Sequence, residues 1–189
     1  PGSWMALSIR LPARVSREDL ADAWLAVVAR HGTLRTAFSA GPDGDPQLHE
    51  IEVGPGGWVE HEIAAGQAVN DALRGVLDAA CSPYQQPSHR LCLLETAAAL
   101  TVVIAADHSH VDMWSMLVIA RDLLALLGGA GFGRAAALPP APELLCRRCR
   151  NARHPVQPAG NVRALCSGKR GIRLQHHSGS SLAGGLCGL

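Results

Sequence analysis

A short segment rich in proton-transferring groups, Asp107-His108-Ser109-His110-Val111-Asp112, follows a run of apolar residues. Its place predicts a loop where a buried strand gives way to a helix, a junction that holds a side chain firmly while exposing it to a cleft. An imidazole there suits general base chemistry, because its pKa lies close to neutral pH. The segment therefore offers His108 as a candidate base and Asp112 as a carboxylate that orients the loop or pairs with a cation.

His110 permits a second interpretation of this segment. Two histidines two residues apart would share a face of a strand and could hold a metal together. The sequence offers no obvious third ligand nearby. We therefore interpret His110 as a residue of the loop or the cleft edge and predict no metal site.

The elements that must position this segment follow from hydrophobic periodicity and from turn residues. Ser16, with Asp19 three residues later, predicts a capped helix start, and Gly32 its end. The β-branched run within residues 100–106 predicts a central strand covered on both faces. Strands are expected at 4–11, 34–39, around Leu48 to Glu52, around Trp58 to Glu62, at 90–96 and at 100–106, and helices at 16–32, 67–80 and 114–127.

Composition limits the class of protein. Hydrophobic residues make up 48% of the 189 residues and charged residues 17%, which suits a chain that buries a core. The densest apolar run, 117–127, is interrupted by Arg121 and Asp122, and a membrane-spanning helix needs about 20 apolar residues. We therefore predict no membrane span. Two isolated cysteines, Cys81 and Cys92, in the globular part fit a reducing cytoplasm.

Two blocks of this sequence resemble the motifs of one enzyme family. Residues 107–115 resemble the HHxxxDG motif of condensation domains in nonribosomal peptide synthetases and of related chloramphenicol-acetyltransferase-like acyltransferases, with His108 on the second His, Asp112 on the Asp and Ser115 on a Ser that often follows. Residues 30–38, Arg-His-Gly-Thr-Leu-Arg-Thr-Ala-Phe, resemble the RHExLRTxF block. The resemblance covers roughly residues 3 to 127.

The sequence departs from the family pattern at three positions of these motifs. Asp107 stands where the family has its first His, Met113 where it has Gly, and Gly32 where it has Glu. A carboxylate at Asp107 is expected to raise the pKa of His108. Loss of the glycine at Met113 removes backbone freedom and could narrow the cleft.

The resemblance implies a fold and an activity. The expected fold is α/β, a two-layer sandwich of a mixed β-sheet with helices packed on it, forming one lobe of a chloramphenicol-acetyltransferase-like structure. The implied reaction moves an acyl group from a thioester on a phosphopantetheine carrier protein or CoA to an amine or hydroxyl. His108 would be the base and Asp112 would hold the loop, while Asp107, Arg35, Trp114 and Ser115 support them. Arg35 would pair with Asp112 or be a solvated residue at a strand end, and the helix start at Trp114 would stabilise the oxyanion.

The resemblance also implies partners. The thioester is a substrate, so no bound cofactor is expected, and the activity belongs to natural-product or lipid biosynthesis. The family's opening segment and its second lobe, which forms the other wall of the substrate channel, are expected to be missing. The alternative function is that of a truncated, inactive remnant that acts at most as a binding module.

The last part of the chain differs in composition. Residues 1–145 carry all 16 acidic residues and a net charge of −7, whereas residues 146–189 carry +8. Cys146, Cys149, Cys166 and the pair at His176 and His177 suggest a zinc-bound nucleic-acid module. The tail has no aromatic residue and no apolar periodicity, so we predict instead a disordered basic tail from frameshift read-through and no nucleic-acid partner. The predicted organisation is a lobe at 1–127, a linker at 128–145 and this tail at 146–189.

Overall fold

The computed structural model describes residues 3–11, 15–97, 99–131 and 173–182 of the chain. Along the sequence these form strands, helices and one 3₁₀ turn. The elements are β1 (Trp4–Leu11), α1 (Arg17–Arg30), η1 (Gly32–Arg35), β2 (Thr36–Ala40), β3 (Pro46–Glu50), β4 (Glu52–His61), α2 (Val69–Ala80), β5 (His89–Glu95), β6 (Leu100–Asp107), α3 (Met113–Gly131) and β7 (Arg173–Leu182).

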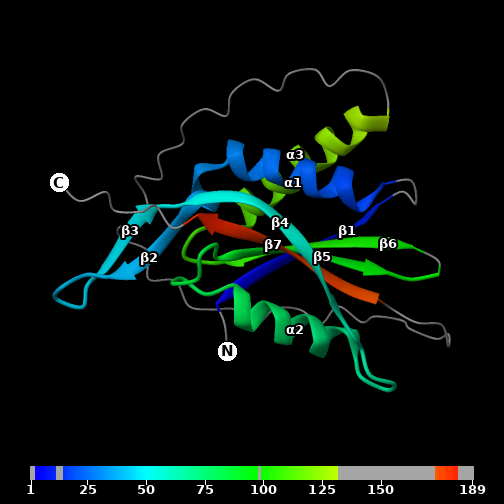
Figure 1. The fold of residues 1–189 in the computed structure, drawn as a ribbon, viewed down its shortest axis with the longest axis horizontal. Helices are drawn as coiled ribbons and strands as arrows, with labels where there is room; N and C mark the ends of the chain where they lie inside the picture. The colour runs from blue at the N-terminus through cyan, green and yellow to red at the C-terminus, as the bar shows by residue number, and fades with distance from the viewer. Residues whose placement is uncertain (1–2, 12–14, 98, 132–172, 183–189) are drawn as a thin grey trace.

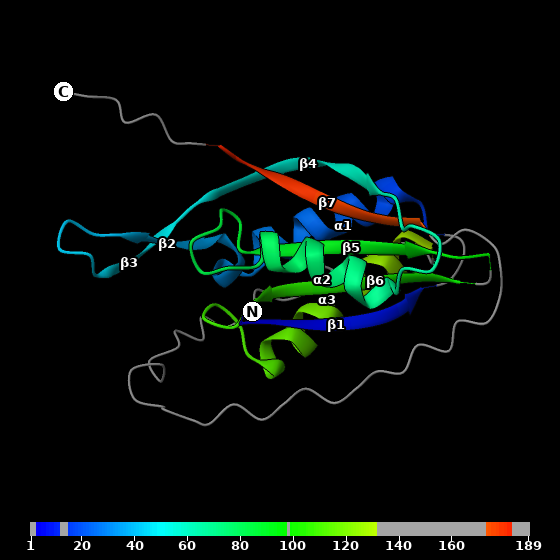
Figure 2. The ribbon, with the colours of Figure 1, turned by 90° about the horizontal axis from the view of Figure 1, so that it is seen from below.

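A five-stranded sheet in the order β1-β6-β5-β7-β4 forms the centre of the described structure. Figure 2 shows these strands side by side, with β1 at one edge and β4 at the other. Each described pairing in it is antiparallel, although the sequence predicted a mixed sheet. Strands β2 and β3 form a separate two-stranded hairpin, which extends past the end of the sheet.

Helices cover both faces of this sheet (Figure 1). On one face α1 and α3 pack Leu20, Trp24 and Ile119, among others, onto the apolar side chains of β5 and β6. On the other face α2 packs Leu77 and Ala80 against a smaller apolar cluster. The α/β class and the single-lobe fold are confirmed, but α2 adds a third layer to the two-layer sandwich that the sequence predicted.

The central position of β6 agrees with its sequence. Residues 102–107 of β6 are all buried, because the strand lies between β1 and β5 and has helices on both sides. A continuous apolar run is what such a doubly covered strand requires. The strand therefore forms a rigid support for the loop that follows it at His108.

The helix ends confirm some predicted signals and correct others. Ser16 caps α1, accepting a hydrogen bond from the backbone of Asp19 at 3.0 Å. The C-cap of α1 is His31, one residue before the predicted Gly32. Helix α3 continues to Gly131, so the glycines at 128 and 129 do not end it and the predicted linker cannot begin at residue 128. The rest of that linker lies outside the described residues.

The prediction of a disordered tail is wrong for residues 173–182. They form β7, which pairs with β5 on one side and with β4 on the other. Within it Leu174 is fully buried and joins the cluster under α2. These residues can form a strand without apolar periodicity because the pairing uses backbone groups. Without β7, strands β4 and β5 would each have unpaired N–H and C=O groups along one edge, and an extended segment between them pairs with both edges. The other residues of the predicted tail, with all four of its cysteines, lie outside the described residues.

Candidate active site

The loop after β6 is fixed from several sides. The carboxylate of Asp107 is fully buried and accepts hydrogen bonds from the Ser3 hydroxyl at 2.9 Å and from the Ser109 backbone at 2.9 Å. Its carbonyl accepts from the backbone N–H groups of His110 and Val111. Asp107 thus anchors the loop, at the position where the resembling motif has its first histidine.

His108 is exposed and held by its ring as well as its backbone. Its backbone N–H donates to the Ser3 carbonyl at 2.9 Å, and its Nδ1 lies 2.8 Å from the Val111 carbonyl. A carbonyl oxygen can only accept, so Nδ1 must carry the proton in this contact. In the neutral ring Nε2 is therefore the free base. The geometry gives His108 the tautomer that a general base needs.

Asp112 caps the helix that follows. One of its carboxylate oxygens accepts from the backbone N–H and from the hydroxyl of Ser115, each at 2.7 Å. These hydrogen bonds lower the pKa of Asp112, and the nearby charge of His108 lowers it further. Asp112 therefore fixes the junction between the loop and α3, and Ser115 is its direct partner.

Two residues next to Asp112 belong to the first turn of α3. Met113, at the position of the motif's glycine, is its first residue and half exposed, in a helical conformation that any L-residue adopts. Trp114 is 75% exposed. The first turn of a helix leaves backbone N–H groups without partners inside the helix, and here the N–H of Ser115 already donates to the carboxylate of Asp112.

His110 joins the two sequence blocks. The Thr33 hydroxyl donates to the His110 carbonyl, and the Thr36 hydroxyl lies 3.1 Å from its Nδ1. The ring also packs against Phe38, with centroids 5.2 Å apart. Burial lowers the pKa of His110. The interpretation of His110 as a loop residue agrees with these contacts, which tie the loop to η1 and β2.

Arg35 does not pair with Asp112. Its guanidinium lies 3.3 Å from a carboxylate oxygen of Glu50. The sheet register explains this, because Thr36 on β2 lies opposite Glu50 on β3, next to Arg35. Of the two alternatives for Arg35, the pairing with Asp112 is therefore not formed, and Arg35 contacts the β2-β3 hairpin instead.

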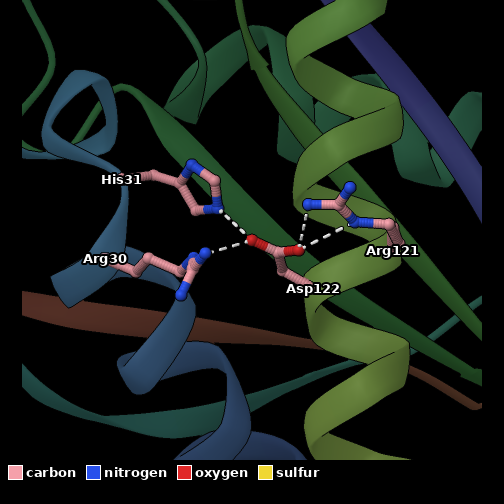
Figure 3. Close-up of polar contacts among 4 residues, drawn as sticks. All are labelled: Arg30, His31, Arg121 and Asp122. Carbon is pink, nitrogen blue, oxygen red and sulfur yellow. Dashed lines mark hydrogen bonds and ion pairs between the residues drawn. The ribbon is translucent and has the colours of Figure 1, made fainter. Parts of the chain in front are cut away.

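A buried ion cluster that sequence patterns did not reveal joins α1 to α3 (Figure 3). The carboxylate of Asp122 is 1% exposed and lies 2.9 Å from Nε of Arg30 and 3.0 Å from Nε2 of His31. Arg121 reaches its other oxygen at 2.8 Å. Burial alone would raise the pKa of Asp122, but hydrogen bonds from Arg121 and His31 outweigh it and the pKa is lowered. The sequence feature that could have pointed to this cluster is Asp122 itself, the lone acid in the apolar run 117–127.

Two negative findings concern the described residues alone. No group of three or more His, Cys, Asp or Glu side chains within them is arranged to hold a metal ion. Among the same residues, no helix is long and apolar enough to cross a membrane.

Sequence comparisons find relatives among peptide synthetases. The chain is 30% identical to nonribosomal peptide synthetase NPS2 of Ceriporiopsis subvermispora over 125 residues, which cover 63% of this chain and 5% of that protein. It is 32% identical to phosphinothricin tripeptide synthetase PhsC of Streptomyces viridochromogenes over 147 residues, covering 73% of this chain and 13% of that protein. No family model matches the chain.

Solved structures share the fold. The SgcC5 protein of Streptomyces globisporus matches with a TM-score of 0.55 and 25% identity, over 73% of this chain and 32% of that chain. A structure of condensation-domain-mediated chain release from the enacyloxin polyketide synthase matches with a TM-score of 0.52 and 26% identity, over 74% and 28%. The starter condensation domain of rhizomide synthetase matches in fold, with a TM-score of 0.53 and 17% identity, over 72% and 34%.

The comparisons confirm the resemblance that the two motifs predicted. The fold is that of one lobe of the chloramphenicol-acetyltransferase-like acyltransferases, and the chain is similar to condensation domains of nonribosomal peptide synthetases over part of their length. Condensation domains act on thioesters bound to carriers and use no cofactor. The chain spans about a third of the solved chains and a small fraction of the synthetases.

Proposed function

We propose that the chain supplies the His108-bearing lobe of a condensation-type acyltransferase. The reaction moves an acyl group from a thioester to an amine or hydroxyl, and peptide bond formation between carrier-bound substrates is the form that the synthetase relatives favour. The observation that carries the proposal is the hydrogen bond from Nδ1 of His108 to the Val111 carbonyl, which makes Nε2 the basic nitrogen of the neutral ring on an exposed side chain.

The reaction balances with His108 as the proton carrier. The nucleophile's N–H or O–H approaches Nε2, and its heteroatom attacks the thioester carbon as the proton moves to the ring. The carbonyl oxygen becomes an oxyanion, which the first turn of α3 near Trp114 stabilises. The oxyanion collapses, the carbon–sulfur bond breaks, and the proton passes from Nε2 to the departing thiolate. An amide or ester and a free thiol result, with His108 neutral again.

The other predicted residues act through the loop. Asp112 and Ser115 hold its junction with α3, and Asp107 holds its beginning. Such anchoring keeps the imidazole near the geometry of attack, which can contribute about 7–11 kcal/mol when both substrates are also held. We place Asp112 and Asp107 as positioning residues.

The proposal also names partners and a setting. The acyl donor is a thioester on the phosphopantetheine arm of a carrier protein or on CoA, and a second lobe supplies the other wall of the channel. The setting is natural-product or lipid biosynthesis in the cytoplasm. The similarity to synthetases supports natural-product synthesis and carrier proteins among these options.

One observation favours the second candidate function, an inactive remnant that binds a partner. Near the loop, α3 exposes several large apolar side chains. They are Met113 at 49%, Trp114 at 75%, Leu117 at 45% and Leu124 at 42%. A row of this kind is expected where another surface packs, whether or not chemistry takes place there.

The test compares matched histidine variants for acyl transfer with acyl-CoA and acyl-carrier donors, in the full-length protein and in the 189-residue chain. In an active protein His108→Ala should lower kcat by about 10²–10⁴-fold, whereas His49→Ala, on β3 away from the loop, should leave it unchanged. The 189-residue chain alone should show no turnover that depends on His108, because this side chain lies open to water. Equal turnover of His108→Ala and the unmodified full-length protein would remove His108 from the mechanism. Full-length protein that binds donors without turnover would favour the remnant.

A further inference from the structure

A cavity of about 440 Å³ lies on the α2 side of the sheet. Its walls come from α2, the end of β4, β5 and β7, and none of its lining residues belongs to the loop at 107–115. Helix α2 turns Ala72, Gly75 and Ala79 toward this space, and these small residues leave it unfilled. The cavity is therefore separate from the candidate active site.

Arg90, on β5, lines this cavity without an acidic partner among the described residues. Four other arginines of the described residues pair with acids. These pairs are Arg17 with Glu60 and Glu95, Arg30 and Arg121 with Asp122, and Arg35 with Glu50. Arg90 is half buried, and its Nη1 donates to the His89 carbonyl at 3.2 Å. A guanidinium carries five donors in a planar fork that matches an oxyanion, so most of this capacity is left for a ligand.

Two histidines stand beside Arg90 in the same cavity. Nε2 of His61 lies 2.6 Å from Nδ1 of His176, and their ring centroids are 4.8 Å apart. Burial lowers the pKa of His176 to about 4, and the charges of His61 and Arg90 add to this effect. The two facing ring nitrogens share one hydrogen bond, one donating and the other accepting, so the guanidinium of Arg90 is the cation of this position.

Acidic groups also line the cavity, but at its rim. Glu62, directly after β4, and Asp71, on α2, are both exposed, whereas Arg90, His61 and His176 are half buried. The guanidinium and the two imidazoles therefore lie deeper than the carboxylates. An oxyanion can reach the guanidinium, and the exposed carboxylates reduce its affinity only weakly because water screens them.

We propose that this cavity binds a small phosphate-type oxyanion, with the guanidinium of Arg90 as its main partner and the hydrogen-bonded pair of His61 and His176 supplying one further N–H donor. A phosphate-type oxyanion suits Arg90 because a half-buried guanidinium without an acidic partner is stabilised most by a charged acceptor that takes several of its hydrogen bonds. The volume exceeds that of phosphate alone, so a phosphate monoester with a small apolar body along Ala72 and Val76 would fill it.

The test titrates the 189-residue chain with inorganic phosphate and with phenyl phosphate by isothermal calorimetry at pH 6.5. Arg90→Gln should weaken binding of both ligands by about tenfold or more, since it removes a charge-assisted hydrogen bond. Arg74→Gln is the matched control, because Arg74 is an exposed arginine of α2 that does not line the cavity. The Arg74→Gln variant should bind both ligands with the affinity of the unmodified chain. Equal affinity of Arg90→Gln and the unmodified chain, or an equal loss in both variants, would overturn the proposal.

A second variant keeps the test decisive if Arg90→Gln fails to fold. Asp71 is exposed, so Asp71→Asn should fold normally, and removing a rim carboxylate should tighten phosphate binding on the order of twofold. The ring NMR signals of His61 and His176 should move as phosphate is added, because both rings line the cavity. Unchanged or weaker binding by Asp71→Asn, with unmoved histidine signals, would contradict the site.

Discussion

At the scale of single residues, Asp112 acts through the start of α3. Its carboxylate caps the helix by accepting from the backbone N–H of Ser115. Asp112→Ala should therefore lower the free energy of unfolding by about 0.5–2 kcal/mol, and Asp112→Asn should lose less, because an amide also caps well. Urea unfolding of the two variants measures the difference. An equal loss of unfolding free energy in Asp112→Ala and Asp112→Asn would show that Asp112 stabilises the helix through its charge and not through the capping hydrogen bond.

A second residue, His89, should make the fold sensitive to acid. Its ring is buried, and Nε2 lies 3.1 Å from the Leu34 carbonyl. Burial, helped by the charge of Arg90, lowers the pKa of His89 from 6.5 to about 3. Below pH 6.5 the unfolded chain therefore binds a proton at His89, whereas the folded chain keeps His89 neutral until the pH approaches about 3. The stability that neutral His89 contributes is complete above about pH 6.5 and is lost as the pH falls toward about 3.

His89→Gln cannot gain this charge, so its unfolding free energy should fall less between pH 7 and pH 4.5. The expected reduction in that fall is about 2.5 kcal/mol, at roughly 1.4 kcal/mol per pH unit below 6.5. Urea unfolding at both pH values measures it, with His49→Gln on β3 as the control that keeps the full loss. An unchanged pH dependence in His89→Gln would assign the acid sensitivity to other groups.

The sequence predicted some site residues and could not predict others. His108 and Asp112 stand in a contiguous motif, so their types and spacing suffice to single them out. The cluster around Asp122 needs contact between residues 91 positions apart, which depends on how α1 packs on α3. The sequence left the partner of Arg35 open for the same reason, because the register of β2 against β3 decides it.

At the scale of elements, the close approach of β4 to β7 depends on one glycine. A side chain at Gly56 would place its Cβ 1.6 Å from the Ser178 carbonyl oxygen of β7, whereas one at Gly57 would meet nothing within 4 Å. Gly56→Ala should force the strands apart and lower the unfolding free energy by about 2 kcal/mol or more, while Gly57→Ala should stay within about 0.5 kcal/mol. Thermal or urea unfolding of the pair decides this. Equal stability of the two variants would show that β7 does not pair here.

Most elements followed from periodicity, but β7 did not. Helices and strands within 4–127 bury regular apolar faces, which a sequence pattern shows directly. Strand β7 instead buries Gln175 and His177 along with Leu174, and Gln175 donates to Glu60. Buried polar residues leave no periodic apolar signal, so a composition argument predicted disorder, although Oε1 of Gln175 and Nδ1 of His177 have no hydrogen-bond partner in the described structure. The interpretation of the tail as frameshift read-through concerns its coding sequence and stays a prediction.

At the scale of the whole molecule, β7 connects two parts of the sheet. β4 is hydrogen-bonded to β7, which in turn is hydrogen-bonded to β5. Leu174 adds a fully buried side chain to the cluster under α2. Leu91 and Cys92, in the middle of β5, also lie opposite residues of this strand. The fold of the described residues is therefore made by the first 131 residues together with 173–182.

A stop after Leu145 should consequently destabilise the chain, because it removes β7. The open edges of β4 and β5 would lose their backbone partners, and Leu174 would no longer cover the α2 face, a loss that for Leu→Ala alone is about 2–5 kcal/mol. A stop after Leu182 is the matched control, since it keeps β7. The shorter chain should unfold at lower urea concentration or aggregate through its exposed strand edges, as size-exclusion chromatography and unfolding curves would show. If both chains unfold alike, residues 173–182 are dispensable, and the sheet is complete without β7.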